Sequence, residues 1–443
     1  MDLNSLIELV ENRDYVTLKS RMIDMQEADV AEFLDVLEAK EAVVVYRLVP
    51  KEIAAEIFSY LDVDKQAEIS LLVSESELNQ IIDELNFDDK IDLIEEMPAG
   101  IVKKILKNST VVERKLINQF LNYEEDSAGS IMTIEFVHLQ AHMSVAEAMA
   151  HIKRTGVNKE TIYTCYVTDQ KRKLEGIVTL KELVLAEDTL LISGLMEKEL
   201  IFVHTHDDQE VIANIFKKYD FLALPVVDQE NRIVGIITID DVVDVIEEET
   251  TEDFQKMAAI NPSVEEYMDV RSFDLAKRRI GWLVILVFTA MISGFIMESN
   301  LYLTSQFMIL NTMVPMLMSA GGNAGAQSST LIIRAITLGE VTFEDMVAVL
   351  WKEAKVGLFI GTTLGVLNFF RIIMTKGDVK LATIVGFTLV GTSLAATTIG
   401  GLLPILAKKV GLDPATMANP LITTITDALT LIIFYAIAAM MLL

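Results

Sequence analysis

The sequence predicts a multidomain chain, with an all-α helical superhelix first, an α/β tandem repeat second and a five-helix transmembrane domain last. Charge, repetition and hydropathy carry this prediction. Residues 271–443 contain 12 Lys and Arg against 9 Asp and Glu, which leaves 25 basic and 56 acidic residues, a net charge of −31, for residues 1–270. Two stretches of the middle region repeat in register, and five long apolar segments follow. A length of 443 residues also suggests about three domains.

The acidic excess bears on possible partners. Binding to nucleic acid needs patches of Lys and Arg, so nucleic acid is not expected as a partner. The excess fits cation binding, although acidic surface also serves plain solubility. The single cysteine, Cys165, excludes an intramolecular disulfide and a Cys-based zinc site. The N-terminus lacks the basic and apolar regions of a signal peptide, so we expect the first 270 residues in the cytosol.

Residues 1–128 form the predicted acidic helical N domain. Short segments such as SLIELVEN, DVAEFLDVLEA and ESELNQIIDEL carry apolar residues at positions i, i+3, i+4 and i+7. Brief polar turns separate the segments in pairs. This pattern predicts a small superhelix in which each helix pair packs on its neighbours.

Residues 129–188 and 189–248 are two copies of one unit. YVTDQKRKLEGIVTLKELV in the first copy matches VVDQENRIVGIITIDDVVD in the second, so that Asp169 aligns with Asp228 and Gly176 with Gly235. Each copy reads as helix, strand, turn, strand, helix. The pair resembles tandem CBS domains, which often bind adenine nucleotides. That resemblance implies ATP as a possible ligand, with Thr179, Asp228 and Asp240 as candidate contacts.

Residues 249–279 read as a polar linker of helical segments, and residues 280–443 hold the predicted pore domain. Its apolar segments each approach or exceed the ~20 residues that cross a bilayer. They cover residues 280–298, 306–335, 350–374, 380–407 and 417–442. Eight Lys and Arg fall on one side and three on the other. The positive-inside rule then predicts a cytosolic N-terminus and an external C-terminus in a cell membrane.

The second segment contains Gly321, Gly322 and Asn323 in the run MSAGGNAGAQSST. Exposed amides and unpaired backbone groups are costly in hydrocarbon, so we expect a break in this helix that lines a polar path. The two glycines would then turn carbonyl oxygens toward a hydrated ion. The alternative is tight helix packing through small residues.

The fifth segment contains Asn419 and Asp427, and Asp427 is the one carboxylate that we place in the apolar interior of a span. A charged Asp at the bilayer centre costs roughly 2.5–3.5 kcal/mol, which makes it a functional candidate. In a symmetric dimer, two such carboxylates would face each other with neighbouring hydroxyls. Oxygen-only donors with few carboxylates suit hydrated Mg²⁺ better than a soft metal.

These segments resemble the MgtE family of Mg²⁺ channels over essentially the whole chain. The resemblance rests on Pro315 followed by GGN-x-G-x-Q and TLIIRA, and on DPA-x₃-NP-x₂-T-x₃-D in residues 413–427. It implies a homodimer with the pore on the two-fold axis. It also implies that cytosolic Mg²⁺ holds a compact, closed state. Ala326 departs from the Asn that is frequent in the family, which leaves selectivity among Mg²⁺, Co²⁺, Mn²⁺ and Ca²⁺ open.

The resemblance also implies acidic metal sites and pore-lining residues. Candidate metal ligands are Glu56, Asp88, Asp92, Asp208, Glu210, Asp220, Asp241, Asp244, Glu249, Glu252, Asp253, Asp413 and Asp427. Candidate pore-lining residues are Gly321, Gly322, Asn323, Asn419 and Asp427. Independently of the family, two copies of an acidic cytosolic region repel each other, and bridging divalent cations would draw them together.

Two other functions remain open. A secondary divalent-cation transporter would use broken helices and a midplane carboxylate, but five spans do not divide into inverted halves. A membrane-anchored nucleotide sensor or enzyme is disfavoured by the lack of a nucleophile, metal cluster or P-loop in the sequence. We therefore expect no enzymatic activity.

Overall fold

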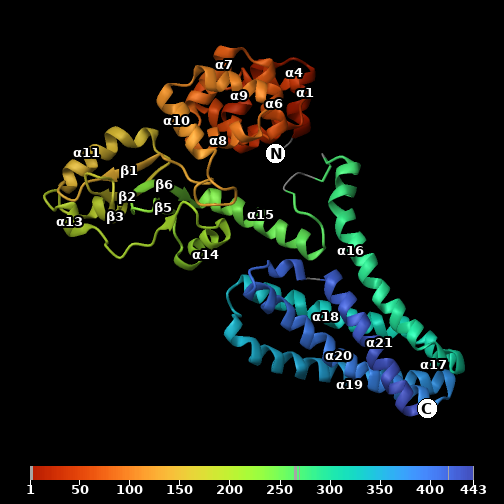
Figure 1. Ribbon diagram of the computed structural model, residues 1–443. Coiled ribbons are helices and arrows are strands. Elements are labelled where there is room, and N and C mark those ends of the chain that lie inside the picture. Colours follow the sequence, from red (N-terminus) through yellow and green to blue (C-terminus); the bar gives the residue numbers. More distant parts are fainter. Residues whose placement is uncertain (1–2, 264–266, 269, 418, 443) are drawn as a thin grey trace. The chain divides into compact units, whose positions relative to one another are not determined.

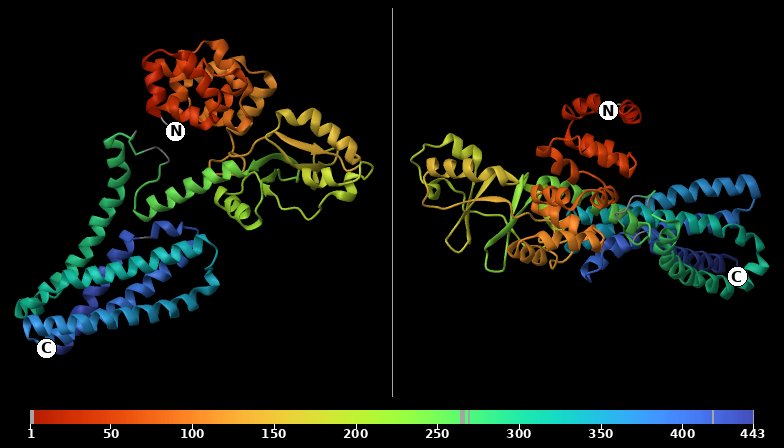
Figure 2. Two further views of the ribbon diagram at one scale, coloured as in Figure 1. Left: turned by 180° about the vertical axis from the view of Figure 1, so that it is seen from behind. Right: turned by 90° about the horizontal axis from the view of Figure 1, so that it is seen from above.

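The computed structural model describes residues 3–263, 267–268, 270–417 and 419–442, and at 51–52, 417 and 419 it describes the backbone alone. The chain forms two compact units, Met1–Ile246 and Glu247–Leu443. Figures 1 and 2 show their elements from three directions. Each unit is described by itself below.

The first unit begins with ten short helices, which agrees with the short amphipathic helices that the spacing of apolar residues predicted. Ser74 and Thr110 begin α7 and α10 with capping boxes, in which the side chain and the glutamate three residues later satisfy end N–H groups. Buried side chains such as Phe33, Phe58 and Ile69 form one continuous core. The helices are α1 (Leu3–Glu11), α2 (Tyr15–Ile23), α3 (Glu27–Asp35), α4 (Ala39–Tyr46), α5 (Lys51–Ser59), α6 (Val63–Leu72), α7 (Glu75–Glu84), α8 (Phe87–Glu96), α9 (Ala99–Asn108) and α10 (Val111–Phe120).

Two three-stranded sheets follow, one in each repeat. In both, the middle strand pairs parallel with the first and antiparallel with the third. This confirms the order of strand, turn, strand and helix in each copy. The elements are β1 (Phe136–Leu139), α11 (Val145–Thr155), β2 (Thr161–Thr168), β3 (Leu174–Thr179), α12 (Leu180–Leu185), α13 (Ile192–Leu195), β4 (Val203–His204), α14 (Gln209–Tyr219), β5 (Ala223–Val227), β6 (Ile233–Thr238) and α15 (Ile239–Met257).

The second unit contains the end of α15 and a helical membrane region. Its helices are α16 (Ser272–Ser299), α17 (Leu301–Gln306), α18 (Val314–Thr337), α19 (Met346–Lys376), α20 (Val379–Lys409) and α21 (Asn419–Leu442). By length and composition, four helices among the described residues can cross a membrane, and these contain α16, α19, α20 and most of α21. The 24-residue α18 is more polar and lies against α20 and α21. The predicted break in the second segment is wrong, because α18 runs as a continuous helix through its glycines.

Glycines let α19 and α20 approach until their backbones touch. A Cβ on Gly361 would lie 2.7 Å from Cα of Val390, and one on Gly365 would lie 2.8 Å from the carbonyl oxygen of Gly386. Such contacts replace the hydrophobic driving force that helices lack in lipid. The pair α19–α20 therefore forms a rigid support for α18, which packs on the same α20.

We expect Gly361→Ala to destabilise the second unit by about 1–3 kcal/mol, because backbone atoms of α20 cannot yield to the added methyl group. Thermal unfolding of the full-length protein in detergent measures this. Gly294→Ala on α16 is the matched control, since a Cβ there meets no atom within 4 Å. The control should be neutral or slightly stabilising. Equal unfolding temperatures for the two variants would contradict the assigned packing.

Candidate functional site

Acidic side chains of three elements gather in the first unit, where α8 meets the first repeat and the start of α15. The predicted ligands Asp88 and Asp92 lie one turn apart on α8, and Asp241 lies in the first turn of α15. In addition to burial, the charge of Asp88 raises the pKa of both Asp92 and Asp241, and the charge of Asp241 also raises the pKa of Asp92. The structure therefore brings together three residues that are far apart in the sequence. We call the group the α8 acidic cluster, made of Asp88, Asp89, Asp92, Glu135, Glu160, Asp240 and Asp241.

Burial dominates the electrostatics of this cluster. It raises the pKa of Asp88 to about 7 and that of Asp92 to about 8, with neighbouring acids adding to both shifts. Burial, followed by the charges of nearby acids, raises the pKa of Asp89 to about 6, that of Glu160 to about 8 and that of Asp241 to about 7. Near neutral pH these carboxyls therefore need protons or another positive charge.

Two carboxylate oxygens of the cluster accept no hydrogen bond and could bind a cation. Oδ1 of Asp88 and Oε2 of Glu160 are buried and have no hydrogen-bond partner. Within the described ranges, however, no three His, Cys, Asp or Glu side chains converge closely enough to hold a metal ion together. Hard oxygen donors that repel one another suit a hydrated divalent cation, which needs few direct ligands. The residue types thus fit Mg²⁺, bound partly through water.

Sequence reasoning missed Asp89, Glu135 and Glu160. Asp89 follows Asp88 directly, so a count of acids on α8 would have included it. Glu135 directly precedes β1 and Glu160 directly precedes the parallel strand β2, and N of Glu160 donates a hydrogen bond of 2.9 Å to O of Glu135. No motif in the sequence marks either residue. Their place depends on how the helical domain packs on the first repeat.

Other predicted ligands are not brought together in the chain. Asp208 caps the start of α14 and accepts a hydrogen bond from N of Glu210 at 2.8 Å, whereas Asp220 ends the same helix in a left-handed conformation. The eleven residues of α14 separate Asp208 from Asp220, a distance of about 18 Å along the helix. One ion cannot bind both. Glu56 is exposed on α5 and lies near Tyr60. Burial raises the pKa of Tyr60, and the charges of Glu56 and of acids in the α8 acidic cluster raise it further.

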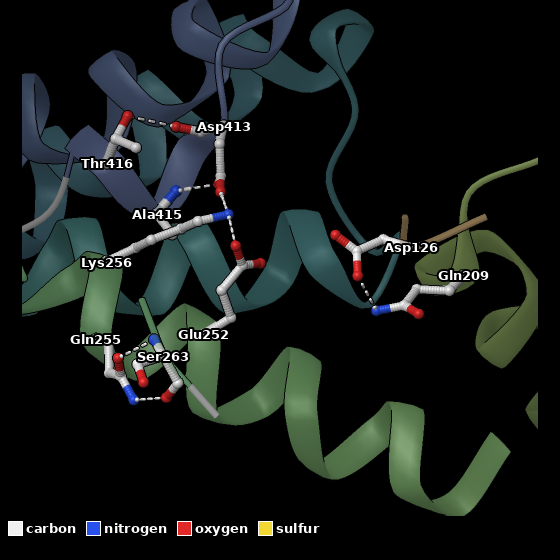
Figure 3. A network of polar contacts seen from close by, with 9 residues as sticks. All are labelled: Asp126, Gln209, Glu252, Gln255, Lys256, Ser263, Asp413, Ala415 and Thr416. Carbon is white, nitrogen blue, oxygen red and sulfur yellow. Dashed lines mark hydrogen bonds and ion pairs between the residues drawn. The ribbon is translucent and has the colours of Figure 1, made fainter. Parts of the chain in front are cut away.

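A second polar group lies in the second unit, where the end of α15 meets the loop before α21 (Figure 3). Nζ of Lys256 lies 2.7 Å from Oε1 of Glu252 and 2.6 Å from Oδ2 of Asp413. The other carboxylate oxygen of Asp413 accepts a hydrogen bond from N of Ala415 at 2.8 Å. The backbone carbonyl of Asp413 accepts from Thr416. Asp413 is therefore held in a fixed orientation toward the lysine.

Asp253 belongs to the same place. Burial first, and then the charge of Asp413, raise the pKa of Asp253. Burial lowers the pKa of Lys256, but hydrogen bonds to Asp413 and Glu252 outweigh it and raise the pKa above its usual range. We call Glu252, Asp253, Lys256 and Asp413 the α15 charge group. Three of its four members were predicted as metal ligands, and Lys256 was missed. The predicted ligands Asp244 and Glu249 lie farther up the same helix.

Asp427 is half-buried on α21 beside the glycines of α18. A Cβ on Gly322 would lie 3.7 Å from Oδ1 of Asp427, and one on Gly321 would lie 2.5 Å from Oγ1 of Thr430. Gly321 and Gly322 thus provide close packing, the alternative to carbonyl exposure. Within the described part of the chain, no ion pair reaches Asp427. The side chain of Asn419 lies outside the described residues.

The opposite face of α18 is polar and exposed. Asn323, Ala326, Gln327, Thr330 and Leu331 line a hollow of about 550 Å³. Positions 323, 327 and 330 follow helical spacing, so amide and hydroxyl groups form one stripe. A stripe of this kind is costly against lipid and needs water or another protein surface.

Glu353, near the start of α19, is a second carboxylate held among the helices of the second unit. Glu353 of α19 is buried, with only 9% of its surface exposed. Oγ of Ser328 on α18 lies 2.8 Å from Oε2 of Glu353 and 2.8 Å from the carbonyl oxygen of Thr397 on α20. Oγ1 of Thr397 donates to the carbonyl oxygen of Glu353 at 2.9 Å. These contacts join α18, α19 and α20. Lys352 and Lys355 flank Glu353 in the sequence, and these neighbours gave no sign that the glutamate is buried.

A cavity of about 1250 Å³ lies between the two repeats. Tyr163, Thr179 and Lys181 line it from the first repeat, and Tyr219 and Asp220 from the second. Aromatic faces, hydroxyls and a cation in one concave site are suited to a nucleotide. Thr179 also begins α12 by accepting a hydrogen bond from N of Glu182.

The other nucleotide candidates have different surroundings. Asp228 accepts hydrogen bonds from N of Glu230 and N of Arg232, and so builds the turn between β5 and β6. Asp169 does the same in the first repeat. Asp240 belongs to the α8 acidic cluster, where it raises the pKa of Glu160.

Comparison with known proteins places these features in a family. The sequence model described as "Divalent cation transporter" (MgtE) matches residues 314–437, the MgtE intracellular N domain matches 25–126, and the CBS domain matches 128–188 and 192–248. The magnesium transporter MgtE of Thermus thermophilus is 35% identical over 99% of this chain and 98% of its own length. That of Bacillus subtilis is 31% identical over 97% and 98%, respectively.

Two solved structures resemble the first part of the chain. The soluble part of a magnesium transporter has a TM-score of 0.52 and 30% identity, covering 56% of this chain and 97% of that structure. The cytosolic domain of the Mg²⁺ channel MgtE in complex with ATP has a TM-score of 0.52 and 34% identity, covering 55% and 99%.

The raised pKa values predict a pH dependence of the first unit. Acids whose folded-state pKa lies above the usual value near 4 stabilise the fold at low pH, and this contribution is lost as the pH rises through about 6 to 8. Without divalent cations, we expect the first unit of the full-length protein to unfold roughly 3 °C or more lower at about pH 8.5 than at about pH 5.5. Millimolar Mg²⁺ should remove most of the difference.

Calorimetry or limited proteolysis at increasing temperature measures this shift. Asp92→Asn should reduce the pH dependence, whereas Asp83→Asn on α7 should leave it as in the wild type. If Asp92→Asn and the wild type show the same pH dependence, the cluster is not its source.

Proposed function

The chain belongs to the MgtE family of magnesium transporters, and from this premise we propose that it is a homodimeric Mg²⁺ channel of the cell membrane that cytosolic Mg²⁺ closes. The observation that carries the pore assignment is Asp427, a half-buried carboxylate on α21 that faces the glycines of α18. A charge in this position is costly unless an ion uses it. Hydrated Mg²⁺ retains most of its water and binds through one or two carboxylates, so a path with Asp427 as its carboxylate suits this ion.

The exposed polar stripe of α18 supports the dimer. Asn323, Gln327 and Thr330 cannot face hydrocarbon without loss, and a second copy related by a two-fold axis would enclose them around water. Asp427 from each copy would then contribute one carboxylate to the same path. Ala326 lies in the same hollow and makes this part of the path wider and less polar than an asparagine would. We propose that the N-terminal end of the first span faces the cytosol, because Lys277, Arg278 and Arg279 directly precede it in the sequence.

The two acidic groups support regulation by the transported ion. Carboxyls of the α8 acidic cluster are held with raised pKa values and unused oxygens, so a cation that binds there stabilises the packed form. Depletion of Mg²⁺ restores their repulsion and favours a looser form. The coupling to the pore is a shift of population, which requires tighter ion binding in the closed state.

We further propose that ATP binds in the cavity between the repeats. A relative has been solved with ATP in its cytosolic domain, and the present cavity offers the chemistry that a nucleotide needs. Tyr163 and Tyr219 present aromatic faces for a base, and Lys181 presents an ammonium for phosphates. The chain has no P-loop, so bound ATP would act as a ligand and not as a substrate.

One observation favours a transporter coupled to a second cation. Glu353 is buried among three helices and provides a carboxylate that Mg²⁺ permeation does not require. A coupled transporter would need an opposing gradient of protons or Na⁺, whereas a channel would not. Flux measurements that impose and abolish such gradients separate the two functions.

Asp427→Asn is the direct test of the pore. Removing the charge while keeping the shape should lower Mg²⁺ flux into proteoliposomes by about tenfold or more, the equivalent of about 1.4 kcal/mol in barrier height. Asp378→Asn is the control, because Asp378 caps α20 through N of Leu381 and Asn can cap equally well. Unchanged flux in Asp427→Asn would remove the pore assignment.

Lys181→Glu tests the nucleotide site. Reversing the charge should weaken ATP binding to the full-length protein by roughly tenfold, as measured by calorimetric titration. Lys171 lies in a turn of the same repeat, and the Lys171→Glu variant should bind ATP like the wild type. Equal affinity in Lys181→Glu and Lys171→Glu would place ATP elsewhere.

A further inference from the structure

Lys256 occupies the position between Glu252 and Asp413 that a cation would take in the α15 charge group. Its ammonium lies 2.6 Å from Asp413 and 2.7 Å from Glu252, and Asp253 lies near enough for its pKa to respond to both Asp413 and Lys256. At these separations no second cation fits between the ammonium and either oxygen. The lysine and a divalent ion are therefore alternative occupants of one carboxylate set.

From this geometry we propose that Lys256 is a tethered competitor that sets the affinity of the α15 charge group for divalent cations. The inference rests on the proposed function, in which these carboxylates bind regulatory Mg²⁺, and it adds the residue that determines how much Mg²⁺ is needed. With the lysine in place, the carboxylates of Glu252 and Asp413 already share one positive charge. A divalent ion must first displace that ammonium, and so it binds more weakly than to the same carboxylates alone.

The surroundings keep the competitor in place. Asp413 is oriented by N of Ala415, and Met257, the next residue on α15, packs against Ile333 and Ala415. This apolar contact anchors the end of α15 independently of the ion pairs. Loss of the lysine charge therefore need not release the helix, and a divalent ion can replace the ammonium while the carboxylates stay in position.

The size of the effect follows from partial exposure. The side chains of Lys256, Glu252 and Asp413 are 22%, 38% and 34% exposed. Ion pairs with such access to water are screened and contribute modestly to binding. Removing the ammonium should accordingly lower the half-saturating divalent concentration by about three- to tenfold. A purely structural lysine predicts the opposite sign, since its loss would loosen the carboxylates.

The test uses the full-length protein in detergent and Mn²⁺ as the probe, with bound ions counted by electron paramagnetic resonance. Lys256→Met, which keeps an unbranched apolar side chain without the ammonium, should bind the ion of this site about three- to tenfold more tightly. Lys256→Arg should resemble the wild type. Lys277→Met, at an exposed lysine of α16, is the control for general loss of charge. If Lys256→Met does not fold, Lys256→Gln replaces it.

Asp413→Asn distinguishes the two hypotheses. It should remove one bound Mn²⁺, and the gain from Lys256→Met should vanish in the double variant. If Asp413→Asn removes no ion, the regulatory site of the proposed function is absent here. If it removes one ion but Lys256→Met leaves the affinity unchanged or weaker, the site stands and the competitor role of Lys256 is overturned.

Discussion

The other features of this chain depend on one constraint, the repulsion between carboxylates that lie close together and partly shielded from water. Nearby cations are too few to balance their charge. The α8 acidic cluster holds seven acids between a helical domain and a repeat, and burial raises the pKa of Asp88, Asp92 and Asp241. The packed form of the first unit therefore carries negative charge that its own cations do not balance. Protons neutralise this charge at low pH, and a bound divalent ion can neutralise it at about pH 7. The same deficit recurs in the α15 charge group, where the protein supplies Lys256.

Close helix packing makes a comparable arrangement possible in the second unit. Gly357, Gly361 and Gly365 bring α19 onto α20, and α18 then packs against α20 and α21 through its own glycines. Bulkier residues would separate α18 from α21 and move Asp427 away from Gly322. A half-buried carboxylate is tolerated there because the helices that hold it are fixed by backbone contacts. Packing and chemistry therefore use the same small residues, which is why composition alone did not separate the two roles.

The elements of the fold were largely predictable because each carries a local signal. Apolar spacing marked the ten short helices, and the repeated Asp-Gln turn and Gly-Ile strand marked both sheets. The candidate sites were predictable in part. Asp88, Asp92 and Asp241 were named from the family pattern, whereas Glu135, Glu160, Lys256 and Glu353 depend on tertiary contacts that no spacing reveals. The predicted break at Gly321 failed because close neighbours, and not a cavity, accommodate those glycines.

The regulation that we propose needs more than one weak ion site. Moving a two-state equilibrium from 1:99 to 99:1 requires about 10⁴-fold tighter binding to the favoured state. A partly exposed carboxylate pair that changes affinity about tenfold between states contributes about 1.4 kcal/mol, so roughly four such ions are required. α15 carries acids of both groups along one continuous helix, from Asp240 to Asp253. In the proposed mechanism, ions bound near either end would bias the same helix, and Lys256 as a competitor would make the response of its site begin at a higher ion concentration.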